Sequence, residues 1–431
     1  MIKIAIVGAA SYVFGPSMIK QALVEHRLND VELALMDPHR EGVNLMGHFA
    51  RRVASDLGLT ARITTHTEAD TALQGADFVI CSAAREMARR FGMDCAIIDR
   101  HMPDHWATEF GGIAGISYSL RQMALITDLT DRMKRLCPQA WLFTSSNPLP
   151  RVAQAAHENG VRTVGFCSAS IGNYNFAWNL LRGESAPYPF SPPRAAWDLT
   201  MAGLNHFTWG LAFRERGTGR DLLPELHARV LASPESRSTR YAALLAETGR
   251  LVLACDEHIR DFLVPYGPRP PRQVMAHGTA EERRQRLEQL RAAGDGQGPW
   301  DPIFAHESWE RPMDLVAALA FGAPAEFHAL NLINSGQIPN LRRAVFVETP
   351  ARGSPRGPEP QACTLPPGVL SYCERTALVT DTIVRAFRER SRKILHEAVE
   401  LDPTVLNNTA GCAASDECLQ AHADILPAFG S

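Results

Sequence analysis

Two short segments carry side chains that could hold a metal ion. One is Gly-Phe-Cys, which ends at Cys167, and the other is Gly-Leu-Asn-His, which ends at His206. A thiolate and an imidazole are both ligands for divalent transition metals. Two ligands are too few for a closed structural zinc site, so the pair favours an open catalytic site completed by water and substrate oxygens. Considered alone, each residue is more often part of a protein core.

The N-terminus has the pattern of a dinucleotide-binding turn. Gly-Ala-Ala-Ser follows an apolar run of strand length and is a degraded form of G-x-G-x-x-G, with alanine in the place of the second glycine. A second such run ends in an aspartate, which can bind both ribose hydroxyls and repel a 2′-phosphate. The predicted NAD-binding residues are Gly8, Ala10, Ser11 and Asp37. The nearby Arg40 leaves NADP as an alternative. A dinucleotide beside a metal indicates redox chemistry on a hydroxyl-bearing substrate.

The elements that must position these residues alternate between strands and helices. Strands are predicted at 2–7, 31–36, 76–81, 140–144 and 161–165, with helices at 13–26, 43–57 and 118–136. This alternation predicts an α/β fold with a Rossmann-type, doubly wound parallel sheet over residues 1–165. Cys167 then lies just past the carboxyl end of a strand, where such sheets place their sites.

Residues 166–431 are predicted to form a larger, mixed α/β but mostly helical domain for substrate, metal and oligomer contacts. Proline-rich loops are expected at 186–193, 266–271 and 353–368. Thr279 and Glu282 form a capping-box pattern before a charged helix, interpreted as a solvated face or a subunit contact. A further long helix is expected at 372–401, and the acidic stretch around Asp256 is interpreted as a solvated surface.

Composition excludes several classes of function. The formal net charge of the 431 residues is −3, and no basic tract indicates a nucleic-acid partner. No apolar run is long enough to cross a bilayer, and the N-terminal run lacks the features of a signal peptide. The 9 cysteines are odd in number and have no paired spacing. We therefore expect a reduced, cytoplasmic protein with no membrane partner.

Taken together and in order, the motifs resemble those of glycoside hydrolase family 4, the NAD- and metal-dependent glycosidases. No single motif is specific, but the ordered set is. It extends from the N-terminus to about residue 350. The matching segments are Gly8–Ser11, Asp37, 76–80, 85–94, Gly111–Gly112, Asn147–Pro148, Cys167, Gly203–His206, Asp256–His258 and 334–341.

The resemblance implies a small-molecule glycoside substrate and a homodimer or homotetramer. It implies that Cys167 and His206 bind the metal, usually Mn²⁺, and that either Asp256 or Tyr266 is the base. The substrate contacts implied or suggested are Asn147, Asn205, His258 and Arg85. In the implied reaction NAD⁺ oxidises C3 of the sugar, a base removes the C2 proton and the aglycone leaves C1. Water then adds, and the hydride returns to C3.

One residue departs from the family pattern. Ser168 follows the ligand cysteine, where family members commonly have His or Asp, and serine is a poor general acid. This argues against the usual α-glucosidase, α-galactosidase and phospho-glycosidase groups. It is compatible with a divergent branch such as the NAD-dependent sulfoquinovosidases, because Arg85, Arg89 or Arg90 could pair with an acidic or sulfonated sugar. The alternatives are a dehydrogenase of the lactate and malate type and a non-catalytic NAD-binding relative.

Overall fold

The sheet of this protein runs through both halves of the chain. The computed structural model describes residues 1–182, 196–232, 239–253, 256–267, 269, 279–305 and 310–430, without the side chains of residues 170, 239, 256 and 257. Within these residues the strand order is β3-β2-β1-β4-β5-β6-β10-β11-β7-β8-β9, and β12 pairs with β11. Of the predicted proline-rich loops, 186–193 lies outside the described residues, as does half of 266–271.

The N-terminal half forms the parallel part of the sheet, which confirms the predicted Rossmann-type fold. Its strands are β1 (Ile2–Val7), β2 (Val31–Met36), β3 (Arg62–His66), β4 (Phe78–Cys81), β5 (Trp141–Thr144) and β6 (Arg162–Gly165). Its helices are α1 (Phe14–Ile19), η1 (Lys20–Glu25), α2 (Arg40–Asp56), α3 (Ala69–Leu73), α4 (Met87–His101), α5 (Gly112–Leu136) and α6 (Leu149–Glu158). The single helix predicted at 13–26 is two segments, because the chain passes from α-helix to π-helix at Lys20.

The C-terminal half extends the sheet with antiparallel strands. Its strands are β7 (Trp197–Leu204), β8 (Phe207–Glu215), β9 (Val252–Leu253), β10 (Ala325–Ile333), β11 (Phe346–Ser354) and β12 (Gly357–Pro360). Its helices are α7 (Ala169–Arg182), α8 (Leu223–Ala232), α9 (Thr239–Thr248), α10 (Asp256–Ile259), α11 (Ala280–Gly294), η3 (Asp301–Ala305), α12 (Pro312–Phe321), α13 (Pro367–Glu389), α14 (Arg392–Leu401) and α15 (Asn408–Ala421). Strand β10 joins the two parts by pairing Asn331 with Gly165 of β6.

Two expectations for the C-terminal half were wrong. Residues 353–368 were expected to be a loop, but β11 and β12 pair there as a hairpin. The single helix expected at 372–401 is divided into α13 and α14. The break lies at Arg390, whose φ of 52° ends α13, and at Ser391, whose side chain caps α14 by accepting from Ile394 N. The capping box of Thr279 and Glu282 is confirmed at the start of α11.

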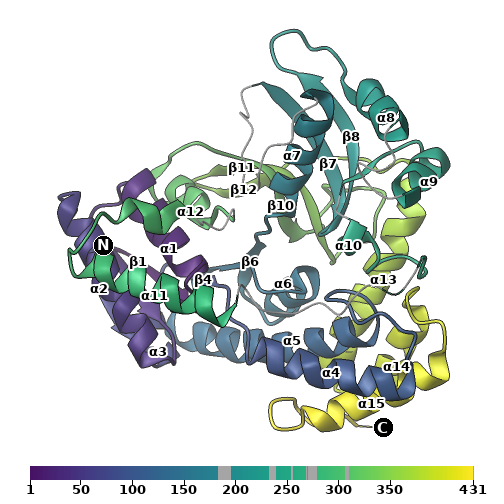
Figure 1. Ribbon diagram of the computed structural model, residues 1–431, viewed down its shortest axis with the longest axis horizontal. Helices are drawn as coiled ribbons and strands as arrows, with labels where there is room; N and C mark the ends of the chain where they lie inside the picture. Colours follow the sequence, from purple (N-terminus) through teal and green to yellow (C-terminus); the bar gives the residue numbers. More distant parts are fainter. Residues whose placement is uncertain are drawn as a thin grey trace.

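The C-terminal helices cover one face of the N-terminal sheet. Apolar residues of β1, β4 and β5 share a buried cluster with residues of α4, α5, α13, α14 and α15. In Figure 1, α4, α5, α14 and α15 lie along the lower side of the molecule, and α13 rises from them on the right towards α9. The burial of such clusters is the main driving force for folding. The chain therefore returns from its second half to complete the core of the first.

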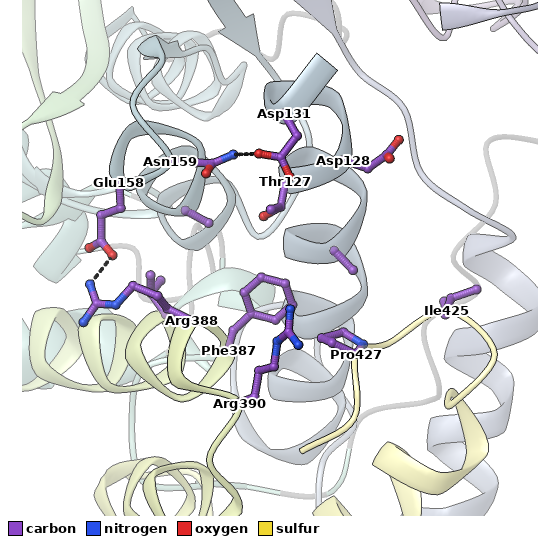
Figure 2. Close-up of a pocket in the computed structure, with 13 residues that line it drawn as sticks. Thr127, Asp128, Asp131, Glu158, Asn159, Phe387, Arg388, Arg390, Ile425 and Pro427 are labelled. Carbon is purple, nitrogen blue, oxygen red and sulfur yellow. Dashed lines mark hydrogen bonds and ion pairs between the residues drawn. The ribbon is translucent and has the colours of Figure 1, made fainter. Parts of the chain in front are cut away.

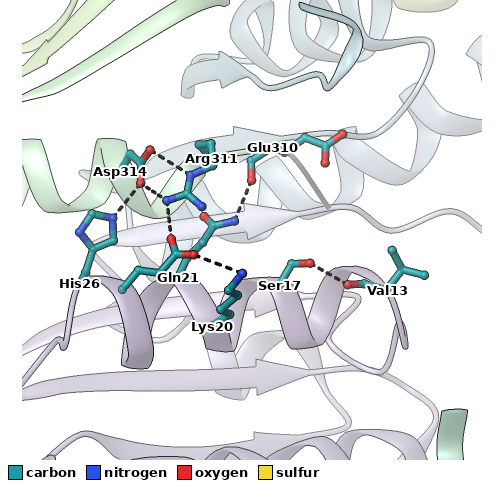
Figure 3. Close-up of polar contacts among 9 residues, drawn as sticks. Val13, Ser17, Lys20, Gln21, His26, Glu310, Arg311 and Asp314 are labelled. Atoms are coloured by element: carbon teal, nitrogen blue, oxygen red, sulfur yellow. Dashed lines mark hydrogen bonds and ion pairs between the residues drawn. The ribbon is translucent and has the colours of Figure 1, made fainter. Parts of the chain in front are cut away.

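The opposite face is joined to the C-terminal half by α12. Figure 3 shows polar contacts between η1 and the start of α12. Gln21 Nε2 donates to the Glu310 carbonyl at 2.8 Å, and His26 Nε2 lies 2.8 Å from Asp314 Oδ1. Arg311 Nη2 lies 2.8 Å from the same Asp314 oxygen. These contacts attach η1 of the nucleotide-binding half to the start of α12, so they connect the two halves of the chain on this face of the sheet.

Candidate active site

A tight hairpin presents His206 to the site. Strands β7 and β8 pair Leu204 with Phe207, which leaves Asn205 and His206 as a two-residue connection. His206 has a φ of 63°, a left-handed conformation that costs a non-glycine residue about 1–3 kcal/mol and is concentrated at functional sites. Gly203 has a φ of 145°, and a Cβ there would lie 2.7 Å from the Phe207 carbonyl oxygen. The backbone of this hairpin thus fixes the position of the His206 imidazole.

The structure brings the two predicted metal ligands together. Cys167 follows β6, and its Sγ lies 3.1 Å from His206 Nε2. Burial is the main cause that raises the pKa of the Cys167 thiol and lowers the pKa of His206 well below its usual value. A divalent cation touching both atoms would stabilise the thiolate and use the neutral imidazole as a ligand. Among the described residues, no group of three or more His, Cys, Asp or Glu side chains is placed to hold a metal.

A buried carboxyl group supports this pair from behind. Asn205 and Asn331 both donate to Glu348 Oε2, at 2.7 and 2.9 Å, and all three side chains are buried. Asn205 also lies near the Cys167 thiol, where its side chain acts to lower the pKa that burial raises. Burial raises the pKa of Glu348. Asn205 therefore orders the metal pair from inside the protein, and its proposed contact with substrate stays a prediction.

A loop before α5 adds a carboxyl group that the sequence reasoning missed. Glu109 is partly exposed and lies near enough to Asn147, the predicted substrate contact at the end of β5, for the Asn147 side chain to act on the Glu109 pKa, which it lowers. Burial raises the pKa of Glu109 to about 7. The next residue, Phe110, places its ring 4.4 Å from the ring of His206. Glu109 thus directly precedes a residue whose ring contacts His206, one of the two predicted metal ligands. The only sign of this loop in the sequence was the neighbouring Gly111-Gly112.

Two buried carboxyl groups hold that loop in place. Phe110 N donates to Asp261 Oδ2 at 2.9 Å, and Gly112 N donates to Asp402 Oδ2 at 2.9 Å. A Cβ on Gly111 would collide with the Asp261 backbone, which explains the need for glycine there. Burial raises the pKa of Asp261 to about 8. The solvated surface expected around residue 256 is therefore wrong at Asp261, which is only 6% exposed.

The segment from α10 to Tyr266 borders the metal pair. The ring of His258 lies 4.1 Å from the ring of His206 and meets it edge-on, and burial lowers the pKa of His258 to about 4. The backbone of Asp256 starts this same helix, but its side chain lies outside the described residues. Tyr266 is partly buried against Trp106, with ring centroids 5.9 Å apart. The structure thus places α10 at the site, while the choice between Asp256 and Tyr266 as base stays a prediction.

The predicted nucleotide turn has the required shape. Gly8 has a φ of 89°, and its N–H donates to the Met36 carbonyl at 3.0 Å. Ala10 N donates to Asp37 Oδ2 at 3.3 Å, and Ser11 Oγ accepts from Phe14 N at 3.1 Å. Along the carboxyl edge the order is β1, β4, β5, β6, so the turn and Cys167 are about 14 Å apart at the usual strand spacing. An extended dinucleotide can cover that distance.

Asp37 provides a direct test of the cofactor preference. Substituting Asp37 with Ala is expected to weaken NAD⁺ binding about 10- to 100-fold, because charge-assisted bonds to the ribose hydroxyls are lost. NADP⁺ should be affected less, since the repulsion of its 2′-phosphate is removed as well. Titration calorimetry of both cofactors measures the ratio of their dissociation constants. A ratio equal to that of the wild-type protein would contradict the role of Asp37.

The three arginines considered for an acidic substrate differ in the structure. Arg90 is 2% exposed and forms ion pairs with Glu86 and Asp424, so it is structural rather than a surface residue. Arg89 is exposed and pairs with Glu86. Arg85 is exposed, follows β4 at the carboxyl edge of the sheet, and forms no ion pair with the described residues. Of the three arginines, only Arg85 therefore has both the position and the unpaired charge that binding of an acidic or sulfonated sugar would require.

A separate cavity of about 400 Å³ lies near the amino end of β6, away from the carboxyl ends of the strands, where the candidate site lies. It is lined by residues of α5, α6, α13 and the C-terminal segment (Figure 2). Glu158 and Asn159 line it at the end of α6, before the amino end of β6, whereas Cys167 follows the carboxyl end. Glu158 pairs with Arg388 at 2.6 Å. Because the cavity and Cys167 lie at opposite ends of β6, the cavity is distinct from the candidate site.

The described helices were also compared with the length and hydropathy that a membrane span requires, and none of them meets both.

Comparison with known proteins matches both halves of the chain. Residues 3–181 match the family model described as family 4 glycosyl hydrolase, and residues 201–405 match the model of the family 4 glycosyl hydrolase C-terminal domain. The chain is 25% identical to an α-glucosidase of Erwinia rhapontici, with 93% of each chain covered. It is 23% identical to an α-galactosidase of Bacillus subtilis (strain 168), with 100% of each covered.

Solved structures show the same fold. A 6-phospho-α-glucosidase from gut microorganisms, in complex with NAD and Mn²⁺, has a TM-score of 0.80 at 19% identity, with 100% of both chains covered. A malate dehydrogenase of Plasmodium falciparum in complex with NADH has a TM-score of 0.51 at 12% identity, covering 93% of this chain and 100% of that one. At these identities the similarity concerns the fold alone.

Proposed function

Because the chain belongs to the family 4 glycosyl hydrolases, glycosidases that use NAD and a divalent metal, we propose that it cleaves a glycoside by transient oxidation of the sugar at C3. The observation that carries this proposal is the 3.1 Å approach of Cys167 Sγ to His206 Nε2, just past the carboxyl end of β6. The metal proposed for this pair is Mn²⁺, which suits a site completed by water and substrate oxygens.

The residues around the pair have separate tasks in this proposal. When bound, NAD accepts and returns a hydride, and the metal supplies a Lewis acid. Cys167 and His206 would hold the metal, while Gly8, Ala10, Ser11 and Asp37 would hold NAD. Asp256 or Tyr266 takes the C2 proton, and Asn147 binds a sugar hydroxyl. Since Ser168 is a poor acid, Glu109 donates the proton to the leaving group, because its raised pKa of about 7 leaves a substantial fraction of the acid form at neutral pH.

An isotope experiment tests the reaction. The protein is incubated with NAD⁺, Mn²⁺ and a glycoside in deuterated water, and the released sugar is analysed by NMR. We expect deuterium at C2, because the C2 proton is removed and replaced from solvent. Cleavage that leaves C2 unlabelled would contradict the elimination mechanism. Accumulation of NADH in proportion to product would instead support the dehydrogenase alternative, and retention of metal by Cys167→Ala would favour the non-catalytic one.

The proposed substrate is an acidic sugar, including a sulfonated one such as a sulfoquinovoside. What supports it is Arg85, an exposed guanidinium at the carboxyl edge with no ion pair among the described residues. The same labelling assay, run with neutral, phosphorylated, uronic and sulfonated glycosides, should give the highest kcat/KM with an acidic one. Arg85→Ala should remove that preference by raising KM, while Arg89→Ala serves as the matched control because Arg89 is paired with Glu86.

The proposed assembly and location follow the family resemblance. We propose a homodimer or homotetramer in the cytoplasm. The eight cysteines among the described residues are free thiols, which supports a reduced environment.

A further inference from the structure

Helix α11 extends from the second half of the chain onto the nucleotide-binding half. Arg291 Nη2 lies 3.0 Å from Glu41 Oε1, at the start of α2, and a Cβ on Gly294 would lie 2.8 Å from the ring of His48, further along α2. The residues of α11 before Arg291 therefore extend past the start of α2, towards the carboxyl edge of the sheet. Arg286 lies five residues earlier, about 7.5 Å further along at 1.5 Å per residue.

Arg286 reaches the nucleotide turn. Its guanidinium carbon lies 5.7 Å from the centre of the Tyr12 ring, and Tyr12 directly follows Ser11. An aromatic face of this kind attracts and orients a cation. Figure 1 shows α11 lying across the front of α2 and β1. The sequence analysis interpreted α11 as a solvated face or a subunit contact. In the structure, α11 places the Arg286 guanidinium at the edge of the predicted NAD site.

Arg284 and Arg291 form close ion pairs within α11 or with α2, whereas Arg286 forms none with the described residues. Its interaction with Glu282 is electrostatic and of longer range. Arg284 pairs with Glu281 and Glu288, and Arg291 pairs with Glu41. The carboxylate four residues before Arg286 is Glu282, which accepts from Thr279 N at 2.6 Å in the capping box. Among the described residues no carboxylate forms an ion pair with Arg286. Its charge is therefore available to a ligand at the turn.

We propose that Arg286, positioned against the ring of Tyr12, binds the diphosphate of NAD. In this fold the diphosphate lies against the turn that follows β1. Ala10 stands where a glycine would let the diphosphate come closest, so an additional cation compensates for the longer approach. Arginine suits the task because its planar group binds phosphate oxygens in pairs. Asp37 disfavours a 2′-phosphate, which leaves the diphosphate as the anion for Arg286.

The proposal rests on the use of NAD and is tested by binding alone, without turnover. Calorimetry on the full chain compares NAD⁺, ADP and adenosine for wild type, Arg286→Ala and Arg286→Gln. Both variants should bind NAD⁺ and ADP about 10- to 100-fold more weakly, because a charge-assisted contact is lost. Adenosine, which has no phosphate, should change by less than about twofold. Arg286→Lys should fall between the wild type and the neutral variants, since it keeps the charge but not the planar fork.

Matched variants distinguish a direct contact between Arg286 and the diphosphate from a general effect of charge. Arg284→Ala removes a cation from the same helix and should leave NAD⁺ affinity unchanged. Tyr12→Phe keeps the ring, so it should weaken NAD⁺ binding less than Tyr12→Ala does. Tyr12→Ala should weaken binding, and adding Arg286→Ala to it should weaken binding little further. Wild-type affinity for NAD⁺ and ADP in both Arg286→Ala and Arg286→Gln would overturn the proposal. Failure of the wild-type protein to bind NAD⁺ would instead contradict the proposed function.

Discussion

Substituting Cys167 with alanine is expected to lower kcat about a thousandfold and to weaken Mn²⁺ binding at least tenfold. The thiol lies 3.1 Å from His206 Nε2, so its loss leaves one protein ligand of the pair. The rate loss corresponds to about 4 kcal/mol, the scale on which a metal stabilises developing charge in a transition state. Steady-state kinetics and titration with Mn²⁺, followed by electron paramagnetic resonance, measure the two effects.

The controls for this variant come from the same chain. Cys412→Ala removes another partly exposed cysteine, in α15, and should retain full activity and metal binding. Binding of NAD⁺ to Cys167→Ala in the absence of metal should be unchanged, since the nucleotide turn is at another strand. If Cys167→Ala bound Mn²⁺ as tightly as the wild type, the metal site would have to be placed elsewhere.

Substituting Glu109 with glutamine is expected to lower kcat about 10²- to 10⁴-fold, the usual contribution of a general acid. Glutamine keeps the size of the side chain and can still hydrogen-bond to Asn147, but it has no acidic proton to donate. The effect should be smallest on glycosides with a good leaving group, such as nitrophenyl glycosides, because these need little protonation. A comparison of kcat for activated and alkyl glycosides measures this difference.

The pH dependence gives an independent check on Glu109. Burial raises the pKa of its carboxyl group to about 7, so the acid form that donates a proton is present below that pH and is lost above it. We therefore expect kcat/KM of the wild type to fall as the pH rises through about 7. This decline should be absent in Glu109→Gln. Glu109→Asp should keep a decline, because the acid is retained. A decline that is identical in wild type and Glu109→Gln would assign the titration to another group.

Local patterns were sufficient to predict the front half of the fold. The strands at residues 2–7 and 31–36 and the turn at Gly8 are confirmed, because buried parallel strands are continuous apolar runs and the turn needs a positive φ. The second half was harder to predict. Strand β12 contains Gly357, Pro358 and Pro360, residues typical of loops, and it forms only because β11 is available as a partner. The predicted domain boundary at residue 165 stays a prediction.

The candidate site was only partly visible in the sequence. Cys167 was singled out because it follows a predicted strand, and the family resemblance paired it with His206. The structure brings the two side chains together. Glu109 and Asp261 were missed, since a carboxyl group in a linear sequence gives no sign of its burial. The burial that raises their pKa values comes from segments far apart in the chain. The hydrogen bond from Phe110 N to Asp261 joins two such segments, although the bond itself acts to lower the pKa of Asp261.

The sequence by itself predicted the turn after β1 and the parallel sheet, because these depend on residue types at short spacing. It also singled out Cys167 and His206 as candidate metal ligands, but only through the family resemblance, since they lie 39 residues apart. The tertiary structure alone decided what surrounds them. It set Glu348 behind Cys167, Glu109 beside Asn147 and Arg286 above Tyr12. Each of these placements joins segments that are distant in the chain, and such contacts are selected by the packing of the whole core rather than by local preference.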